Sequence, residues 1–363
     1  VGGRVIPAQY PVPADSHIWT NDEGVFKPSP LNDPLFKSVG LVSGAVWSDL
    51  RLDGFPELII ACEWGGIRVF ENRQGELSES TSQWGLDDQV GWWQGVNAGD
   101  FDGDGRMDLV ASNWGLNHAY QSIGADQLHW YSGRSVPNGP LLLLEGYVDE
   151  AHPTAVPIRG FDVFSATLPG AKDRFRTHSG FAKATIEAAL GNKFSSFQSH
   201  RVKTFSHTVF LNRGDHFEPV PLPWLSQLAP GFALAVADVD LNGTEDLFLS
   251  QNVFYLRPDM SRMDAGRGIM LLGSGNGQFD PISGEQSGIA VYGEQRGAAF
   301  GDFDNDGRID LVVTQNGSKT RLFRNQQQRR GLRVRLNAGP MNETGIGALI
   351  QVDNGMGFGA ARE

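Results

Sequence analysis

The stretch DFDGDGRMDLVASN, residues 100–113, carries the most information in this sequence. It joins a loop with aspartates at its first, third, fifth and ninth positions to an apolar run typical of a β-strand. Two segments repeat it, DVDLNGTEDLFLSQN from Asp238 and DFDNDGRIDLVVTQN from Asp302. A further copy, DLRLDGFPELIIACE from Asp49, keeps the spacing but has Arg51 at its third position. The chain is therefore built from internal repeats.

The similarity continues beyond each loop. A third apolar run ends at Asn72, Asn212 or Asn325, and a turn with a large apolar residue follows, as in GEL at 75–77 and DHF at 215–217. The loops begin roughly 50 to 65 residues apart, close to the length of a four-stranded propeller blade. We therefore predict an all-β fold, a β-propeller of four-stranded blades. Five blades are readable, counting RSVPNGPLLLLE near residue 134, and six or seven if GVF at 24–26 and the C-terminal strands add more.

One segment interrupts this rhythm, between about 150 and 206. SGFAKATIEAALGN predicts a short helix with Ser179 as its N-cap and Gly191 at its end. We expect an insertion packed on the rim of a blade, within a propeller that spans residues 1–330.

The acidic loops predict calcium sites. Carboxylates at alternate positions of a tight loop converge on one point, which is unfavourable without a cation. Ligands that are all oxygens favour Ca²⁺ over softer metals. The seventh position would contribute its backbone carbonyl. The predicted ligands of three sites are Asp100, Asp102, Asp104, Arg106 and Asp108; Asp238, Asp240, Asn242, Thr244 and Asp246; and Asp302, Asp304, Asp306, Arg308 and Asp310.

The copy that begins at Asp49, the first along the chain, leaves two alternatives. Its acids Asp49, Asp53 and Glu57 could hold a fourth calcium ion, or Arg51 could bridge them in place of an ion. An EF-hand is disfavoured, because its loop needs a glutamate at position 12 and flanking helices, and here that position is Ala111, Leu249 or Val313. Acidic turn residues that only bond their own backbone are the remaining alternative, which three complete copies disfavour.

Composition excludes several classes of protein. The formal net charge of −12 disfavours nucleic-acid binding, because that function needs a basic surface. Cys62 is the single cysteine, so neither an internal disulfide nor a thiolate metal site is expected. No apolar stretch approaches the roughly 18 residues of a transmembrane helix. The chain starts at Val1 without a signal-like segment, from which we expect a processed or excised piece.

The loops, the apolar runs and the turns resemble FG-GAP/VCBS repeats, which build integrin-α-type propellers with calcium in the loops. RGLRVRLNAGPMNETGIGALIQV, residues 330–352, resembles the start of the UnbV/ASPIC segment of the cartilage-acidic-protein-like family, with GIGA at 345–348 as its clearest feature. The resemblance implies that residues 331–363 begin that β segment. It also implies an extracellular, cell-surface or periplasmic protein, bacterial in many members, whose function lies in binding.

We therefore expect a calcium-binding adhesion module for a protein or glycan ligand, and no enzyme. The tryptophans Trp64, Trp84, Trp92, Trp93 and Trp114 are either core or a stacking surface for sugar rings. Two alternatives remain: a structural subunit of a larger surface assembly, and a carbohydrate-active enzyme, a polysaccharide lyase or hydrolase. The acid–base group of such an enzyme would come from Glu63, His118, Tyr120 and His129.

Overall fold

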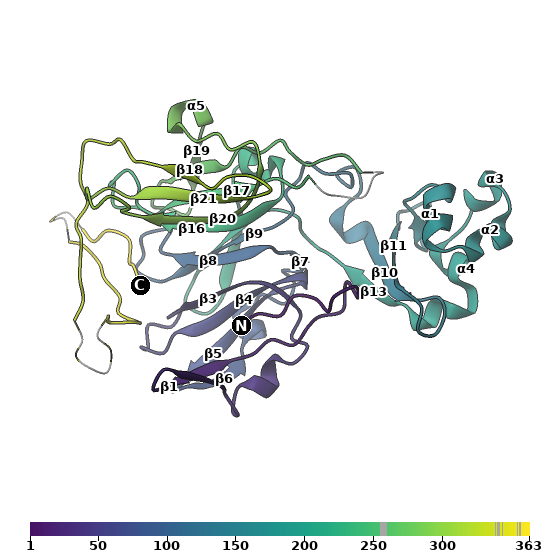
Figure 1. The fold of residues 1–363 in the computed structure, drawn as a ribbon, viewed down its shortest axis with the longest axis horizontal. Coiled ribbons are helices and arrows are strands. Elements are labelled where there is room, and N and C mark those ends of the chain that lie inside the picture. The colour runs from purple at the N-terminus through teal and green to yellow at the C-terminus, as the bar shows by residue number, and fades with distance from the viewer. Residues whose placement is uncertain (255–259, 338, 340–341, 343, 354, 356) are drawn as a thin grey trace.

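Four antiparallel sheets lie side by side in chain order (Figure 1). The computed structural model describes residues 1–254, 260–337, 339, 342, 344–353, 355 and 357–363. Sheet 1 consists of β3 (Leu41–Ser48), β4 (Glu57–Gly65), β5 (Ile67–Arg73) and β6 (Glu76–Glu79), with β7 (Gly91–Trp92) beside β4. Sheet 2 consists of β8 (Gly95–Gly99), β9 (Asp108–Ser112), β14 (Thr208–Asn212) and β15 (Phe217–Pro221). Sheet 3 consists of β16 (Gly231–Ala237), β17 (Asp246–Gln251), β18 (Ile269–Gly273) and β19 (Phe279–Ile282), and sheet 4 of β20 (Glu294–Gly301), β21 (Asp310–Asn316) and β22 (Arg321–Phe323).

The sheets pack face to face through their alternating apolar residues. In β17, Leu247 and Leu249 face sheet 2, whereas Phe248 between them contacts the core shared with sheet 4. The first strands adjoin in order, β3 with β8, β8 with β16 and β16 with β20. Sheet 1 lies at one side of the stack, and sheets 3 and 4 overlap at the other side in this view (Figure 1). The prediction of a β-rich repeat fold is confirmed at this level.

The N-terminal segment covers the outer face of sheet 1. The expected GVF hairpin is present as β1 (Trp19–Asp22) and β2 (Val25–Pro28), followed by a short 3-10 helix, Asp33–Phe36. Phe36 packs on Phe70 of sheet 1 with the ring centroids 4.8 Å apart.

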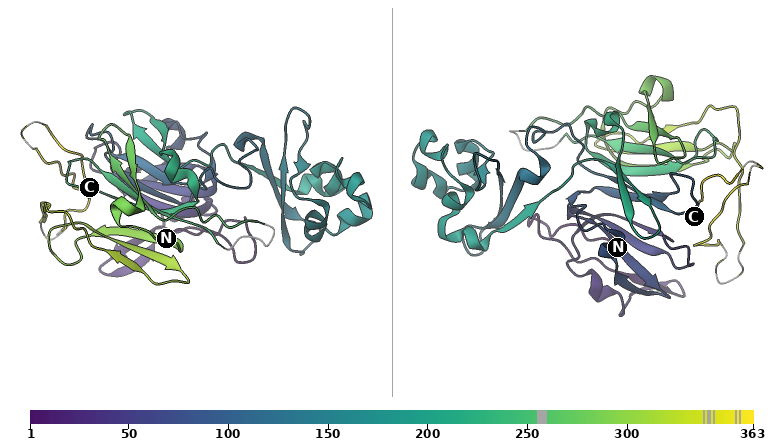
Figure 2. Two further views of the ribbon diagram at one scale, coloured as in Figure 1. Left: turned by 90° about the horizontal axis from the view of Figure 1, so that it is seen from above. Right: turned by 180° about the vertical axis from the view of Figure 1, so that it is seen from behind.

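The insertion is longer than expected and interrupts sheet 2. The chain leaves sheet 2 after β9 and returns at β14, and Figure 2 shows the intervening part projecting from the stack. Its sheet has the order β12-β11-β10-β13, which differs from that of the repeat sheets, so the fifth copy expected near residue 134 is not a repeat sheet. Its strands are β10 (Leu128–Arg134), β11 (Leu141–Tyr147), β12 (Val156–Pro157) and β13 (Gln198–Arg201). Its helices are α1 (Phe161–Thr167), α2 (Gly170–Phe175), α3 (His178–Phe181) and α4 (Ile186–Leu190).

The helix expected from Ser179 is divided in two. Thr177 caps α3 and Thr185 caps α4 through their side chains, because each accepts a hydrogen bond from a backbone N–H of the following turn. Gly191 follows α4, as expected. The remaining short helices are α5 (Gly284–Ser287) and the 3-10 helices Thr81–Trp84, Ala125–Gln127, Gly191–Ser196 and Trp224–Leu228.

The C-terminal part after β22 runs as irregular chain along the stack. Two isolated bridges, Ile350 with Arg362 and Asp353 with Phe358, are its β contacts in the described residues. Within the 330–352 motif, residues 338, 340–341 and 343 lie outside the described part. None of the helices that the structure describes has the length and apolar character needed to cross a membrane.

Candidate metal centres

All four acidic loops lie at the same end of the stack. Each joins the first strand of its sheet to the second, so residues 49–57, 100–108, 238–246 and 302–310 occupy equivalent places. This end faces away from the insertion, because the chain enters the insertion at the far end of β9 (Figure 1).

The first aspartate of each loop organises the loop backbone. Asp100 accepts hydrogen bonds from the N–H groups of Asp104 (3.1 Å) and Gly105 (3.0 Å), one at each carboxylate oxygen. Gly105 has φ +88°, a left-handed conformation that favours glycine. The same two bonds recur in the other loops, from Asp53 and Gly54 to Asp49, from Asn242 and Gly243 to Asp238, and from Asp306 and Gly307 to Asp302.

The ninth acid ties the loop to the third strand. One oxygen of Asp108 accepts the N–H of Phe101 (2.8 Å), and the other accepts the N–H of Asn212 (2.7 Å). Asp246 and Asp310 make the equivalent pairs of bonds. Burial raises the pKa of Asp108 and of Asp246 to about 7, and it does the same for Glu57 in the first loop. A cation that binds beside these carboxyls would therefore favour the loss of their protons.

Three clusters of carboxylates could hold a cation. In each, one oxygen from every member lies within 4.8 Å of the others. The clusters are Asp100, Asp102 and Asp108; Asp238, Asp240 and Asp246; and Asp302, Asp304 and Asp306. In the first, Oδ1 of Asp102 is buried without a hydrogen-bond partner, which is costly unless a cation approaches it. The oxygen-only donor sets fit Ca²⁺.

Some predicted ligands are engaged elsewhere. Asp104 pairs with the guanidinium of Arg106, and Asp310 belongs to the backbone bonds rather than to the third cluster. Asn242 Oδ1 accepts the N–H of Thr244 at 2.8 Å. In the part of the chain that the structure describes, Asp49, Asp53 and Glu57 form no such cluster.

Among the residues that the structure describes, Arg51 forms no ion pair with the carboxylates of the first loop, so the bridging alternative is wrong. Its guanidinium lies over the ring of Trp84, 5.3 Å from the centroid, and its Nε is 3.7 Å from Glu71. The indole face and the carboxylate of Glu71 hold this guanidinium, and its charge acts on Glu57 only at a distance, where it offsets part of the rise in pKa that burial causes.

The side chain at the seventh loop position makes a hydrogen bond that the sequence did not predict. Arg106 Nε donates to the carbonyl of Asn212 at 2.9 Å, and Arg308 Nε donates to that of Asn325 at 3.1 Å. In sheet 3 the hydroxyl of Thr244 donates to the carbonyl of Gly273 at 2.8 Å. This position therefore ties the loop to the third strand.

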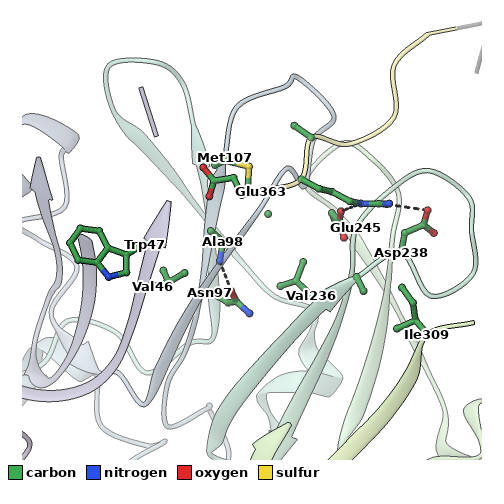
Figure 3. A pocket seen from close by; sticks show the side chains of 14 residues that line it. Val46, Trp47, Asn97, Ala98, Met107, Val236, Asp238, Glu245, Ile309 and Glu363 are labelled. Atoms are coloured by element: carbon green, nitrogen blue, oxygen red, sulfur yellow. Dashed lines mark hydrogen bonds and ion pairs between the residues drawn. The ribbon is translucent and has the colours of Figure 1, made fainter. Parts of the chain in front are cut away.

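The C-terminal residues cross three of the loops, which the sequence also did not predict. The N–H of Ala361 donates to Asp100 at 2.8 Å. Arg362 pairs with Glu245 (2.5 Å) and Asp238 (3.2 Å), and both acids are labelled in Figure 3. Glu363 accepts the N–H of Asp49 at 2.5 Å. Together they border a cavity of about 350 Å³ between the first strands of sheets 1 to 3.

The tryptophans separate into two groups. Trp84 and Trp93 are buried in the core between sheets 1 and 2. Trp64, Trp92 and Trp114 lie at the other end of the stack, where Trp92 and Trp64 also contact Trp130 of the insertion at 5.0 and 4.7 Å between centroids. This aromatic cluster joins the insertion to the repeat sheets.

Of the four residues nominated for acid–base chemistry, Tyr120 belongs to the same aromatic cluster and His118 and Glu63 lie beside it, whereas the ring of His129 stacks on Tyr131 of the insertion. Glu63 accepts hydrogen bonds from Arg4 and Tyr10, both at 2.5 Å. His118 Nδ1 accepts the backbone N–H of Tyr120 at 3.1 Å, and burial lowers the pKa of His118 to about 4. Burial also lowers the pKa of His129. None of these bonds joins two of the four nominated side chains.

One comparison with known proteins agrees with the repeat. A family model described as an FG-GAP-like repeat matches residues 49–111, which include the first two acidic loops. No curated protein matches the chain. One similar solved structure is titled "Crystal structure of BBS1N in complex with ARL6DN, soaked with mercury"; it is 8% identical, with 87% of this chain and 90% of that chain covered and a TM-score of 0.21. That score is too low for a structural argument, so the FG-GAP-like repeat is the likeness that informs function.

Proposed function

We propose that this chain is a propeller-type module that binds calcium in its acidic loops and acts as a protein- or glycan-binding adhesion module. Its place would be extracellular, at the cell surface or in the periplasm, where calcium can be abundant. The observation that carries the proposal is the triplicate cluster of carboxylates at one end of consecutive sheets. The FG-GAP-like repeat supports it.

The proposed ions act on stability and shape. A cation that binds the folded loops alone stabilises the fold by RT ln(1 + [L]/Kd). It would also relieve repulsion among the clustered aspartates and offset part of the net charge of −12. The loops would then present a fixed surface at that end of the stack for a ligand.

We further propose that residues 1–330 form the propeller-type part and that residues 331–363 begin an UnbV/ASPIC-like segment. The buried Ala361 and the ion pairs of Arg362 support a close association between this segment and the loops.

A thermal melt tests calcium binding. We expect chelation with EGTA to lower the melting temperature by several degrees, and added Ca²⁺ to restore it. Asp102→Asn should reduce this calcium-dependent shift, because Asp102 belongs to the first cluster. Asp215→Asn is the matched control, since Asp215 is an exposed acid of the neighbouring hairpin. If a metal-free sample melts identically with and without calcium, the proposed sites are wrong.

A further inference from the structure

The junction between consecutive sheets has a repeated apolar contact. In sheets 1 and 2, the second residue of the acidic loop is covered by the outer hairpin of the next sheet. Phe101 is 1% exposed and packs on Phe279 of sheet 3, with ring centroids 5.6 Å apart. Leu50 is 2% exposed and shares a core with Phe217 of sheet 2. An aromatic residue at the start of the fourth strand therefore covers the preceding loop.

The same junctions share a hydrogen bond. The carbonyl of the second loop residue accepts a donor from the next sheet, near the end of that sheet's third strand. Asn212 Nδ2 donates to Leu50 at 3.0 Å, and Asn325 Nδ2 donates to Val239 at 3.0 Å. Between sheets 2 and 3 the donor is the N–H of Gly277, at 2.9 Å from the carbonyl of Phe101. The junctions of sheets 1 with 2 and 2 with 3 thus combine an apolar and a polar contact, and the junction of sheets 3 with 4 repeats the polar one.

Sheet 4 exposes the residues that its neighbours bury. Phe303, its second loop residue, is 69% exposed, and Leu322 is 43% exposed. Leu322 pairs with Val312 across β22 and β21. The equivalent pair in sheet 3 is Met270 with Phe248, and both of those side chains are buried. The exposed residues border a groove of about 380 Å³. This face therefore has the pattern of a junction without the next hairpin.

The N-terminal hairpin is the complementary half. Asn21 pairs with Phe26 across β1 and β2, as Asn212 pairs with Phe217 across β14 and β15. Asn21 Oδ1 accepts the N–H of Gly24 at 2.8 Å, the bond that Asn72 makes with Gly75 in sheet 1. Phe26 nevertheless is 65% exposed, because β1 and β2 form a two-stranded sheet of their own.

Charge favours contact between the β1–β2 hairpin and the exposed face of sheet 4. Residues 13–33 contain four acids and one lysine, whereas residues 317–336 contain seven arginines or lysines and no acid. Within one molecule the two surfaces lie apart, since β1 lies beside sheet 1 and β21 lies with the strands of sheet 3 at the other side of the stack (Figure 1). Complementary charges at two ends of one chain favour association between copies.

We propose that sheet 4 of one copy docks on the β1–β2 hairpin of a second copy, head to tail. Phe26 of one copy covers Phe303 of the other, and Asn21 Nδ2 donates to the carbonyl of Phe303. The contact continues the junction already repeated between sheets 1 to 4. Because it joins two different surfaces, it closes into a ring or extends into a filament, according to the angle between copies.

Sedimentation velocity over a range of protein concentrations tests the association. We expect concentration-dependent oligomers, which weaken at least about tenfold on Phe303→Asp or Phe26→Asp, because each change places a charge in the buried contact. Trp224→Ser is the matched control, since Trp224 is 62% exposed outside both halves. All variants should keep the parental melting curve. A chain that stays monomeric at every concentration would overturn the proposal. This holds even if another protein binds the exposed face of sheet 4.

Thiol cross-linking tests the head-to-tail geometry. Cys62 is the single native cysteine and is buried, so Phe26→Cys and Phe303→Cys each add one accessible thiol. With a short bis-maleimide, a mixture of the two variants should give cross-linked dimers, whereas either variant alone should not. Dimers from Phe303→Cys alone would indicate a symmetric face-to-face contact and overturn the proposal. The absence of dimers from the mixture would overturn it as well.

Discussion

A buried histidine beside the insertion makes stability depend on pH. His207 is fully buried; its Nδ1 accepts the N–H of Asn113 at 2.8 Å, and its Nε2 donates to the carbonyl of Ala229 at 3.1 Å. The neutral ring satisfies both neighbours, and burial lowers the pKa of His207 to about 4. In the unfolded chain its pKa is about 6.5. The contribution of His207 to stability is thus complete above pH 6.5 and is lost as the pH falls toward 4.

We therefore expect His207 to contribute a decrease in the free energy of unfolding between pH 7 and pH 5, while Asp108, Asp246 and Glu57, whose pKa is raised to about 7, contribute an increase. Denaturant titrations at the two values, on the parent and on His207→Gln, separate the two: the variant should lose less stability, or gain more, than the parent as the pH falls. His216→Gln is the control, since His216 is an exposed residue of the β14–β15 hairpin. An unchanged pH dependence in His207→Gln would contradict the assignment.

At this scale, the spacing of the aspartates was sufficient to predict three carboxylate clusters. It could not predict which oxygen serves the backbone and which serves a cation, since Asp108 bonds Asn212, 104 residues further along the chain. The contact of Ala361 with Asp100 spans 261 residues. Such contacts depend on how the sheets assemble, and a local motif carries no information about them.

At the scale of the elements, the asparagine that ends a third strand joins neighbouring sheets. Asn212 is fully buried, and its Nδ2 donates to Leu50 of sheet 1 and to Met107 of its own loop. Asn72, at the equivalent place in sheet 1, donates to Pro56 of its own loop. Loss of the first side chain therefore affects a junction, and loss of the second affects a single sheet.

We expect Asn212→Ala to lower the free energy of unfolding by about 2–3 kcal/mol, because two buried carbonyls lose their donor. Asn72→Ala is the matched variant and should cost about 1 kcal/mol. Urea denaturation of the two variants and the parent measures both values. Equal losses would show that the bond from Asn212 to Leu50 contributes nothing to the junction.

The repeat sheets were predictable because short apolar runs end in turn residues. The bounds of the insertion were not predictable, since β9 pairs with β14 across a break of about a hundred residues in sequence. The segment near residue 134 misled because an Asn-Gly turn beside an apolar run indicates a β-hairpin in general and not this repeat. It lacks the acidic loop that the four repeat sheets share.

At the scale of the whole molecule, the strands separate two regions. The acidic loops and the C-terminal residues occupy one end of the stack, and the insertion leaves from the other (Figure 1). The aromatic cluster at the second end carries the contact between the insertion and the sheets. The two ends should therefore respond to changes independently, because few interactions are shared between them.

Removal of the insertion tests this independence. The chain enters and leaves it at adjacent points, since the N–H of Gly115 donates to the carbonyl of Phe205 at 2.8 Å. A short turn in place of residues 116–204 should therefore leave β9 paired with β14. We expect a lower melting temperature, because Trp92 loses its packing on Trp130. The calcium-dependent shift should be the same as in the full chain, and Trp130→Ala in the full chain is the matched control for the lost packing. If removal of the insertion abolished the calcium-dependent shift while circular dichroism still reported folded sheets, the two ends would be coupled through the strands.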